Sequence, residues 1–200
     1  MTKLPDPKGG SVTLDERRSI FSEIEREILN CRGCQLWRSR RNPVPGEGNL
    51  QATLMFVGEG PGEQEDLKGR PFVGAAGKLL DQLIETLSLK RKDVFITNIV
   101  KCRPPGNRDP LPEEISSCQP FLIGQIGLIC PRIICTLGRH AFHTLVDPQK
   151  NITRAHGQPT TKDGIIYFPT FHPAAALYHD SVLYQLIEDF QKLKVLLKEV

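Results

Sequence analysis

The sequence has no long apolar run, and none of its 200 residues belongs to a stretch approaching the roughly 18–20 apolar residues that span a bilayer. Its first residues also lack the apolar segment and the cleavage-site pattern of an export signal. With 39% hydrophobic and 24% charged residues, the composition is globular. We therefore expect a soluble, cytoplasmic protein without membrane contact, with a flexible tail over residues 1–12 and a single domain over residues 13–200.

The chain also has little net charge, because 26 Lys and Arg residues oppose 23 Asp and Glu residues to leave +3. Nucleic-acid binding depends on a local basic face rather than on the total charge. A basic segment with several breaker residues covers residues 35–51, and we expect it to be a surface loop. Charge alone therefore permits DNA as a partner without requiring it.

Short apolar runs alternate with amphipathic segments along the chain. The runs predict buried strands at residues 53–57, 94–100, 132–137 and 165–168. Helical spacing predicts helices at residues 14–30 and 79–87, from residue 112, from residue 139, and at residues 183–197. Such alternation favours a parallel sheet covered on both faces. We predict an α/β fold, a single three-layer α/β/α sandwich with a central, mainly parallel four-stranded sheet.

Four of the six cysteines form two pairs, Cys31 with Cys34 and Cys102 with Cys118. In a reducing cytosol disulfides are not expected, so these thiols are free for metal binding or packing. Four thiolates suit zinc or an iron–sulfur cluster, and the spacing leaves both open. It also leaves open a lone redox pair beside two packing cysteines. The remaining two lie among isoleucines and are interpreted as core residues: Cys130 and Cys135.

A glycine-rich segment, Gly58–Gly62, follows the first predicted strand. Glycine lets backbone N–H groups approach a ligand closely, and the carboxyl end of a strand is a usual site in α/β sheets. The segment does not match the dinucleotide-binding fingerprint, because Glu63 stands in place of the third glycine, and no Walker lysine follows. Taken alone, the segment indicates a tight turn.

Three other residues lie where they suit contacts to a ligand. Phe72 follows a proline, and its ring suits stacking on a planar ligand, although a lone Phe is more often a core residue. Asn98 lies in an apolar strand, and its amide needs a loop backbone or a ligand edge as partner. His172 follows the last strand, and its imidazole either donates a hydrogen bond to developing negative charge or has a structural role.

Together, five motifs resemble the family 4 (type 4) uracil-DNA glycosylases, over about residues 27–178. The motifs are Gly58–Asp66, Gly69–Gly74, Thr97–Asn98, Lys101–Arg108 and His172–Ala175. The resemblance implies a DNA repair enzyme that hydrolyses the N-glycosidic bond of deoxyuridine, releases free uracil and leaves an abasic site. It implies uracil-containing DNA, single- or double-stranded, as the partner, and a monomeric protein of prokaryotic type that acts at the nucleoid.

The same resemblance implies a [4Fe-4S] cluster held by Cys31, Cys34, Cys102 and Cys118, and so decides between a cluster and zinc. We expect the cluster to be structural, since no chemical step of the reaction uses it. Basic residues flank its ligands, either as scattered surface charge or to hold the DNA backbone: Arg38, Arg40, Arg41, Lys101, Arg103 and Arg108.

The resemblance also assigns the pocket. An extruded uracil is expected to stack on Phe72, with Asn98 reading its N3–H and O4 edge and His172 donating to O2. Aligned donors stabilise the negative charge that develops on the leaving uracil. The walls are expected to contribute backbone contacts: Glu59, Gly60 and Pro61.

The group that orients the attacking water is left open. In the related family 1 enzymes an aspartate of the first motif has this role, and Gly60 stands in the matching place. Glu59 and Glu65 are candidates, since a carboxylate can position water or stabilise the sugar cation, although a helix-start charge is the preferred interpretation of Glu65. Leu177 is a candidate wedge that fills the gap left by the flipped nucleotide.

Two other functions compete with this interpretation. A uracil-capturing protein of the related covalent subgroup would carry a nucleophilic histidine in an arginine-rich inserted loop, and residues 104–109 contain no histidine. An iron–sulfur DNA-binding sensor or polymerase-associated module would keep the fold without turnover. The joint presence of Phe72, Asn98 and His172 disfavours the second alternative.

Overall fold

The computed structural model describes residues 12–200, so the predicted tail lies, apart from Val12, outside the described residues. The strands are β1 (Glu47–Gly48), β2 (Leu54–Gly58), β3 (Phe95–Asn98), β4 (Ile133–Leu137), β5 (Thr160–Lys162) and β6 (Ile165–Thr170). The helices are α1 (Leu14–Asn30), α2 (Glu63–Lys68), α3 (Ala75–Thr86), α4 (Pro112–Ile129), α5 (Arg139–Leu145), α6 (Ile152–Ala155), α7 (Pro173–Ala176) and α8 (Asp180–Leu196). Three short 3-10 helices are η1 (Gln35–Arg38), η2 (Arg91–Asp93) and η3 (Pro105–Asn107).

The strands form one six-stranded sheet in the order β1-β3-β2-β4-β6-β5. The four central strands are parallel and confirm the four predicted ones, while the two edge strands run antiparallel to their neighbours. The prediction of a four-stranded sheet was therefore wrong, because it omitted the two edge strands. Neither edge has the apolar run that identifies a buried strand, because β1 has only two residues and β5 is fully exposed.

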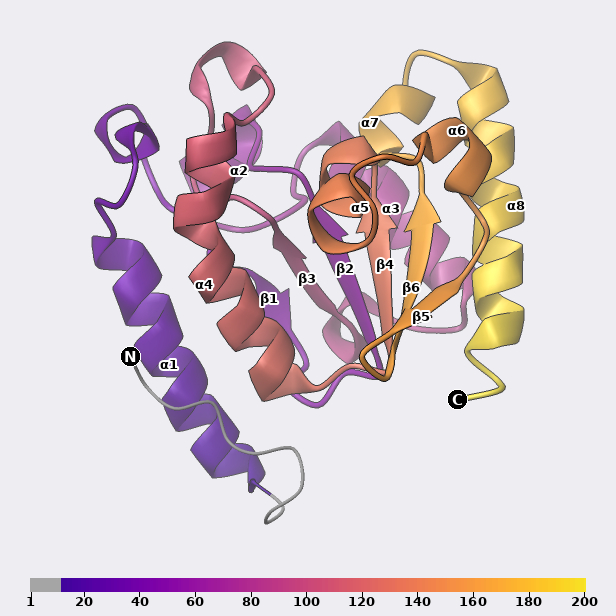
Figure 1. The fold of residues 1–200 in the computed structure, drawn as a ribbon, viewed down its shortest axis with the longest axis horizontal. Coiled ribbons are helices and arrows are strands. Elements are labelled where there is room, and N and C mark those ends of the chain that lie inside the picture. Colours follow the sequence, from indigo (N-terminus) through magenta and orange to yellow (C-terminus); the bar gives the residue numbers. More distant parts are fainter. Residues whose placement is uncertain (1–11) are drawn as a thin grey trace.

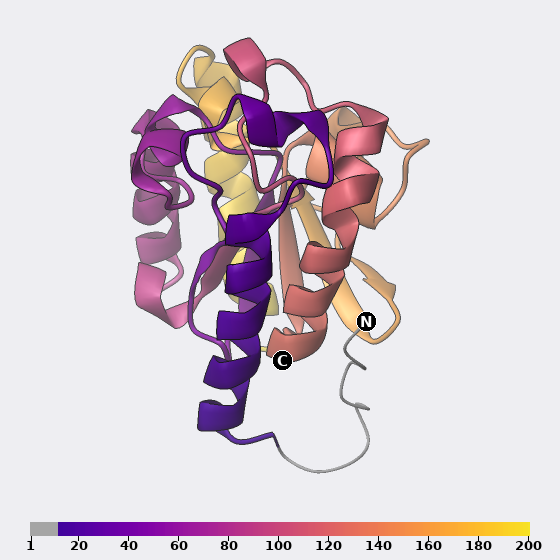
Figure 2. The same cartoon turned by 90° about the vertical axis from the view of Figure 1, so that its left-hand side faces the viewer.

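Helices cover both faces of this sheet (Figure 1), which confirms the predicted α/β/α arrangement. Turned by 90°, Figure 2 shows α1 and α4 on one face and α3 and α8 on the other. Each face has its own buried apolar cluster. On the α8 side, the rings of Phe56 and Phe190 stack with centroids 5.9 Å apart. Among the described residues, no helix is long and apolar enough to cross a membrane.

Helix α1 begins and ends where the sequence predicts. Thr13 and Glu16 form a capping box, in which each side chain accepts a hydrogen bond from the other residue's backbone N–H. Because the helix ends at Asn30, Cys31 lies immediately after its last turn. The first cysteine pair, Cys31 and Cys34, therefore lies at the end of the molecule where the parallel strands also end.

Two local predictions were wrong. Cys130 is exposed rather than in the core, because it ends α4 in a left-handed conformation with φ of 49°, whereas Cys135 in β4 is buried as predicted. The segment 35–51 is not simply a surface loop, since Val44 and Pro45 are buried. The N–H of Val44 donates to the carbonyl of Lys101 at 2.7 Å, so this segment packs beside the end of β3.

Candidate active site and cysteine centre

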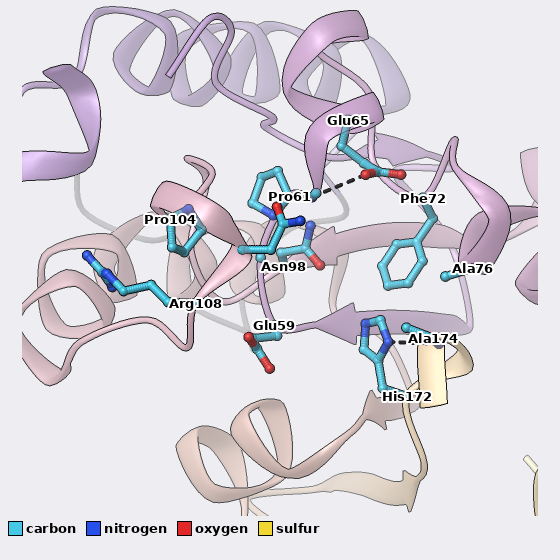
Figure 3. A pocket seen from close by; sticks show the side chains of 13 residues that line it. Glu59, Pro61, Glu65, Phe72, Ala76, Asn98, Pro104, Arg108, His172 and Ala174 are labelled. Carbon is cyan, nitrogen blue, oxygen red and sulfur yellow. Dashed lines mark hydrogen bonds between the residues drawn. The ribbon is translucent and has the colours of Figure 1, made fainter. Parts of the chain in front are cut away.

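A cavity of about 300 Å³ lies at the edge where the parallel strands end. Because β2, β3 and β6 reach this edge together, the residues that follow them meet around one space. Figure 3 shows the side chains converging on it. All the predicted pocket residues line the cavity: Glu59, Gly60, Pro61, Glu65, Phe72, Asn98 and His172.

Asn98 is the last residue of β3, and its side chain is 1% exposed. Its Oδ1 atom is buried and has no hydrogen-bond partner within the described part of the chain. A buried acceptor without a partner is unfavourable unless a ligand or water satisfies it. A side chain at Gly58 would lie 2.5 Å from Oδ1 and 2.6 Å from the Phe72 ring, so glycine is required there for both groups to approach.

Phe72 has a positive φ of 49°, which is unusual for a residue with a side chain. Gly77 of α3 permits this conformation, because a Cβ atom there would lie 1.9 Å from the Phe72 carbonyl oxygen. Arg91 of η2 donates to the carbonyls of both Pro71 and Phe72. The surrounding structure therefore fixes Phe72 in the cavity wall, where its ring is 6% exposed.

Glu65 of α2 supports the same loop. Its Oε1 atom accepts hydrogen bonds from the N–H groups of Val73 at 2.7 Å and Gly74 at 2.8 Å. Its Oε2 atom accepts one from the N–H of Gly62 at 3.1 Å. With both oxygens bound to backbone, Glu65 joins the Gly58–Gly62 loop to the Phe72 loop. This geometry favours the structural interpretation of Glu65 over a role in activating water.

His172 is the N-cap of α7, and its Nδ1 atom accepts a hydrogen bond from the N–H of Ala174 at 3.1 Å. Burial lowers the pKa of His172 to about 4, against an opposing effect of Glu65, so the ring is neutral near pH 7. In a neutral ring whose Nδ1 accepts, the proton is on Nε2. The His172 and Phe72 rings lie 5.6 Å apart at 28° (Figure 3).

Glu59 follows β2 and lies beside a second histidine. Its carboxylate is 3.8 Å from Nε2 of His140, which in turn lies 3.3 Å from the carboxylate of Asp109. Burial raises the pKa of Glu59 above its usual value; Asp109 adds to the rise, while His140 and Arg139 oppose it. The cavity therefore contains one carboxylate whose proton affinity is set by burial and by three neighbouring groups.

The four predicted ligand cysteines line one small cavity between α1, η1 and α4. Two donors point at their sulfur atoms, since Arg40 donates to Sγ of Cys102 at 3.0 Å and the N–H of Gly33 to Sγ of Cys31 at 3.4 Å. Within the described residues, the only three metal-ligating atoms mutually within 4.8 Å come from Glu59, Asp109 and His140. No three of the four sulfur atoms are therefore that close together.

The sequence did not single out Arg91, Asp109 or His140. His140 follows the strand β4 at the same sheet edge as Asn98 and His172, so the rule that selected those residues applies to it as well. Arg91 and Asp109 lie in charged segments without a local signal of their roles. Leu177, the candidate wedge, lies at the end of α7 and is 44% exposed, so the structure places it on the surface beside the site.

The family described as the uracil DNA glycosylase superfamily matches residues 45–196. A type-4 uracil-DNA glycosylase of Sulfurisphaera tokodaii is 52% identical over 185 residues, which cover 88% of this chain and 84% of that protein. The type-4 enzyme of Saccharolobus solfataricus is 52% identical over 180 residues, or 86% and 83% of the two chains. That of Archaeoglobus fulgidus is 44% identical over 181 residues, or 86% and 91%.

Proposed function

This chain belongs to the uracil DNA glycosylase superfamily, alongside the type-4 enzymes, and on this premise we propose that it hydrolyses the N-glycosidic bond of deoxyuridine in DNA. The products are free uracil and an abasic site, the first step in the base excision repair of deaminated cytosine. One observation carries the proposal beyond family membership. A single cavity brings together the unpartnered Asn98 acceptor, the neutral His172 ring and the fixed Phe72 ring.

Asn98 reads the base in this proposal. The N3–H of uracil donates to Oδ1, for which the described residues 12–200 offer no other partner, and Nδ2 donates to O4 of the base. Cytosine has an unprotonated N3 and an amino group, so it places a lone pair against Oδ1 and a donor against Nδ2. Leaving buried polar groups unpaired is the strongest way for a site to reject a near-isostere. Phe72 supplies a planar surface for either base and adds no discrimination.

His172 stabilises the leaving group. When the C1′–N1 bond breaks, its electron pair stays on uracil and spreads onto O2, where Nε2–H of the neutral ring donates a hydrogen bond. Such a preoriented donor contributes about 2.7–4 kcal/mol to lowering the barrier. Ala174 holds the ring in the required tautomer through Nδ1, so the donor is present before the substrate binds.

Glu59 is the group proposed to receive the proton of the attacking water. The water oxygen bonds to C1′ as the base leaves, and the displaced proton passes to the Glu59 carboxylate. A raised pKa suits a base that must hold this proton. His140 and Asp109 act through Glu59 as positioning residues, since Nε2 of His140 lies near the carboxylates of both Glu59 and Asp109.

Cys31, Cys34, Cys102 and Cys118 are proposed to hold a [4Fe-4S] cluster. The four thiols line one cavity, and the donors at Sγ of Cys31 and Cys102 suit the sulfur ligands of such a cluster. When bound, the cluster supplies no group to the glycosidic bond and joins three segments that are distant in sequence.

DNA binding is proposed to use this end of the molecule. Two guanidinium groups lie over the ring of Trp37 in η1, that of Arg32 at 5.0 Å and that of Arg38 at 5.7 Å from the ring centroid. Such basic side chains suit phosphate contacts beside the cavity. Leu177 is proposed to fill the space that the flipped nucleotide leaves in a duplex.

The test is uracil release from oligonucleotides labelled at one end, with uracil in a single strand, opposite guanine or opposite adenine, and with cytosine as control. We expect free uracil and an alkali-labile site at the uracil position without added metal. Protein that shows the broad visible absorption of an iron–sulfur centre and still releases no uracil would overturn the proposal. A protein–DNA adduct stable to denaturation, in place of release, would identify the covalent capture function instead.

A further inference from the structure

Lys101 is a buried lysine that the reaction proposed above does not use, with 1% of its surface exposed. Its Nζ donates to three acceptors: Thr97 Oγ1 at 2.6 Å, Gln125 Oε1 at 2.7 Å and the backbone carbonyl of Asn98 at 2.8 Å. Three acceptors match the three donors of an ammonium group. The carbonyl of Pro45 completes the network, since the Thr97 hydroxyl and the Gln125 amide both donate to it.

The charge of this ammonium has no carboxylate partner among these contacts. Burial lowers the pKa of Lys101 to about 7, the thiols of Cys118 and Cys102 oppose this shift, and Lys101 lines the cavity that the four cysteines share. A buried charge requires a counter-charge, and a centre of four thiolates has net negative charge. Arg40 lies at the same centre, where it donates to Sγ of Cys102 and to the backbone carbonyls of Leu29 and Cys31.

At its other end, Lys101 holds the residue that reads the base. Within the part of the chain that the structure describes, no group donates to Oδ1 of Asn98, so the direction of this side chain depends on packing and on the position of its own backbone. Lys101 binds that backbone directly, at the carbonyl of Asn98. The Thr97 side chain, one residue earlier in β3, accepts from the same ammonium. A single side chain thus links the thiolate centre to the last two residues of the strand.

We propose that Lys101 is a positioning residue that couples the cysteine-bound cluster to Asn98, with the cluster as counter-charge and the Asn98 carbonyl as the group held. The inference rests on the cluster and on the base-reading role of Asn98 proposed above. In this proposal the cluster affects the pocket through the position of Asn98 and takes no part in the hydrolysis. Residues that do not touch a ligand commonly hold in place the residues that do, and so preserve the geometry of the site.

The experiment compares four cluster-containing proteins: the wild type, Lys101→Met, Arg40→Met and Lys198→Met. Two quantities are measured on each, the midpoint reduction potential of the cluster and the inhibition constant of free uracil. Lys101→Met is expected to make the potential more negative, because a positive charge near the cluster is lost, and to weaken uracil inhibition about fivefold or more. Arg40→Met is expected to shift the potential with a smaller effect on uracil. Lys198, which is exposed near the end of α8, is the control for loss of a lysine charge.

A Lys101→Met protein with unchanged potential, or with unchanged uracil inhibition, would overturn the inference. If this variant does not fold, Lys101→Gln takes its place, because it keeps two donors without the charge. Gln125→Glu adds an anion beside the intact ammonium, so the potential should again become more negative while uracil inhibition changes less than twofold. Wild-type protein without iron–sulfur absorption would contradict the proposed cluster. This result is distinguishable from a failure of the Lys101 proposal, which is tested only on protein that contains the cluster.

Discussion

The backbone N–H of Ala174 donates to Nδ1 of His172, and this contact leaves Nε2 as the donor nitrogen of the neutral ring. Replacing His172 with alanine should lower kcat by about 10²–10³-fold, because the donor to uracil O2 is lost, with less effect on DNA binding. Single-turnover rates and a filter-binding assay measure the two effects separately. A loss of DNA binding as large as the loss of rate would contradict this role.

The same residue makes the fold sensitive to acid. The pKa of His172 is lowered to about 4, below its usual value of 6.5, so the unfolded chain takes up a proton first as the pH falls. Stability contributed by this residue is complete above pH 6.5 and is lost as the pH falls from 6.5 towards 4. Urea unfolding of the wild type and of His172→Asn over this range should show a steeper loss in the wild type.

Protonation of Glu59 should cause the fall in rate on the acid side (the acid limb) of the pH–rate profile. Because the pKa of Glu59 is raised, kcat/KM should begin to fall at a higher pH than an ordinary glutamate would give, and Glu59→Gln should lower the rate about 10²–10⁴-fold. Two further variants have opposite expected signs. His140→Ala removes a group that lowers this pKa and should move the limb to higher pH, whereas Asp109→Asn should move it to lower pH. Shifts in the same direction would show that another group titrates.

Much of the fold could be predicted because buried parallel strands carry continuous apolar runs. The strands β2, β3, β4 and β6 and helix α1 follow from such patterns alone. The edge strands could not be found this way, since pairing of Thr160–Lys162 depends on the neighbouring strand and not on its own apolar content. The exposure of Cys130 likewise depends on where α4 ends, which its isoleucine neighbours do not reveal.

Only the pocket residues that lie in sequence motifs could be predicted. Asn98 ends β3 and His172 follows β6, so the strand ends bring them together, but their roles were assigned by the resemblance to the family and not by the local pattern. The backbone conformation of Phe72 and the tautomer of His172 depend on contacts made by Gly77, Arg91 and Ala174, which are tertiary or local-geometric facts. The group around Glu59 likewise required the structure, because Asp109 lies in the segment before α4 whereas His140 lies in α5.

Arg91 should therefore matter although it touches no substrate. Replacing it with alanine removes the donors to the Pro71 and Phe72 carbonyls, so the strained Phe72 loop should relax and kcat/KM should fall about tenfold, mainly through KM. Arg70→Ala is the matched control, because Arg70 shares the Glu47 carboxylate with Arg91 and is itself 60% exposed. Equal losses in the two variants would show that the ion pair, rather than the carbonyl contacts, is responsible.

Asn98→Asp should relax discrimination against cytosine. A carboxylate offers acceptors to the amino group of cytosine and loses the donor that O4 of uracil requires, so uracil release should fall while cytosine release becomes measurable. Asn107→Asp places the same charge in the wall of the cavity, where Asn107 accepts from Arg103, and controls for charge alone. Cytosine release by Asn107→Asp, or its absence from Asn98→Asp, would contradict the base-reading role.

Leu177→Ala should slow uracil release from duplex DNA much more than from single-stranded DNA. Flipping a nucleotide out of a duplex costs a few kcal/mol of stacking and pairing, which an apolar wedge offsets by filling the gap, whereas a single strand has little stack to disrupt. Removing the 44% exposed Leu177 side chain should slow release from duplex about tenfold and leave single-stranded release within twofold. Tyr178→Ala is the companion variant, because Tyr178 is 81% exposed and adjacent. If Tyr178→Ala alone shows the duplex-specific loss, the wedge is the tyrosine, and equal losses on both substrates would place Leu177 in the fold rather than at the DNA.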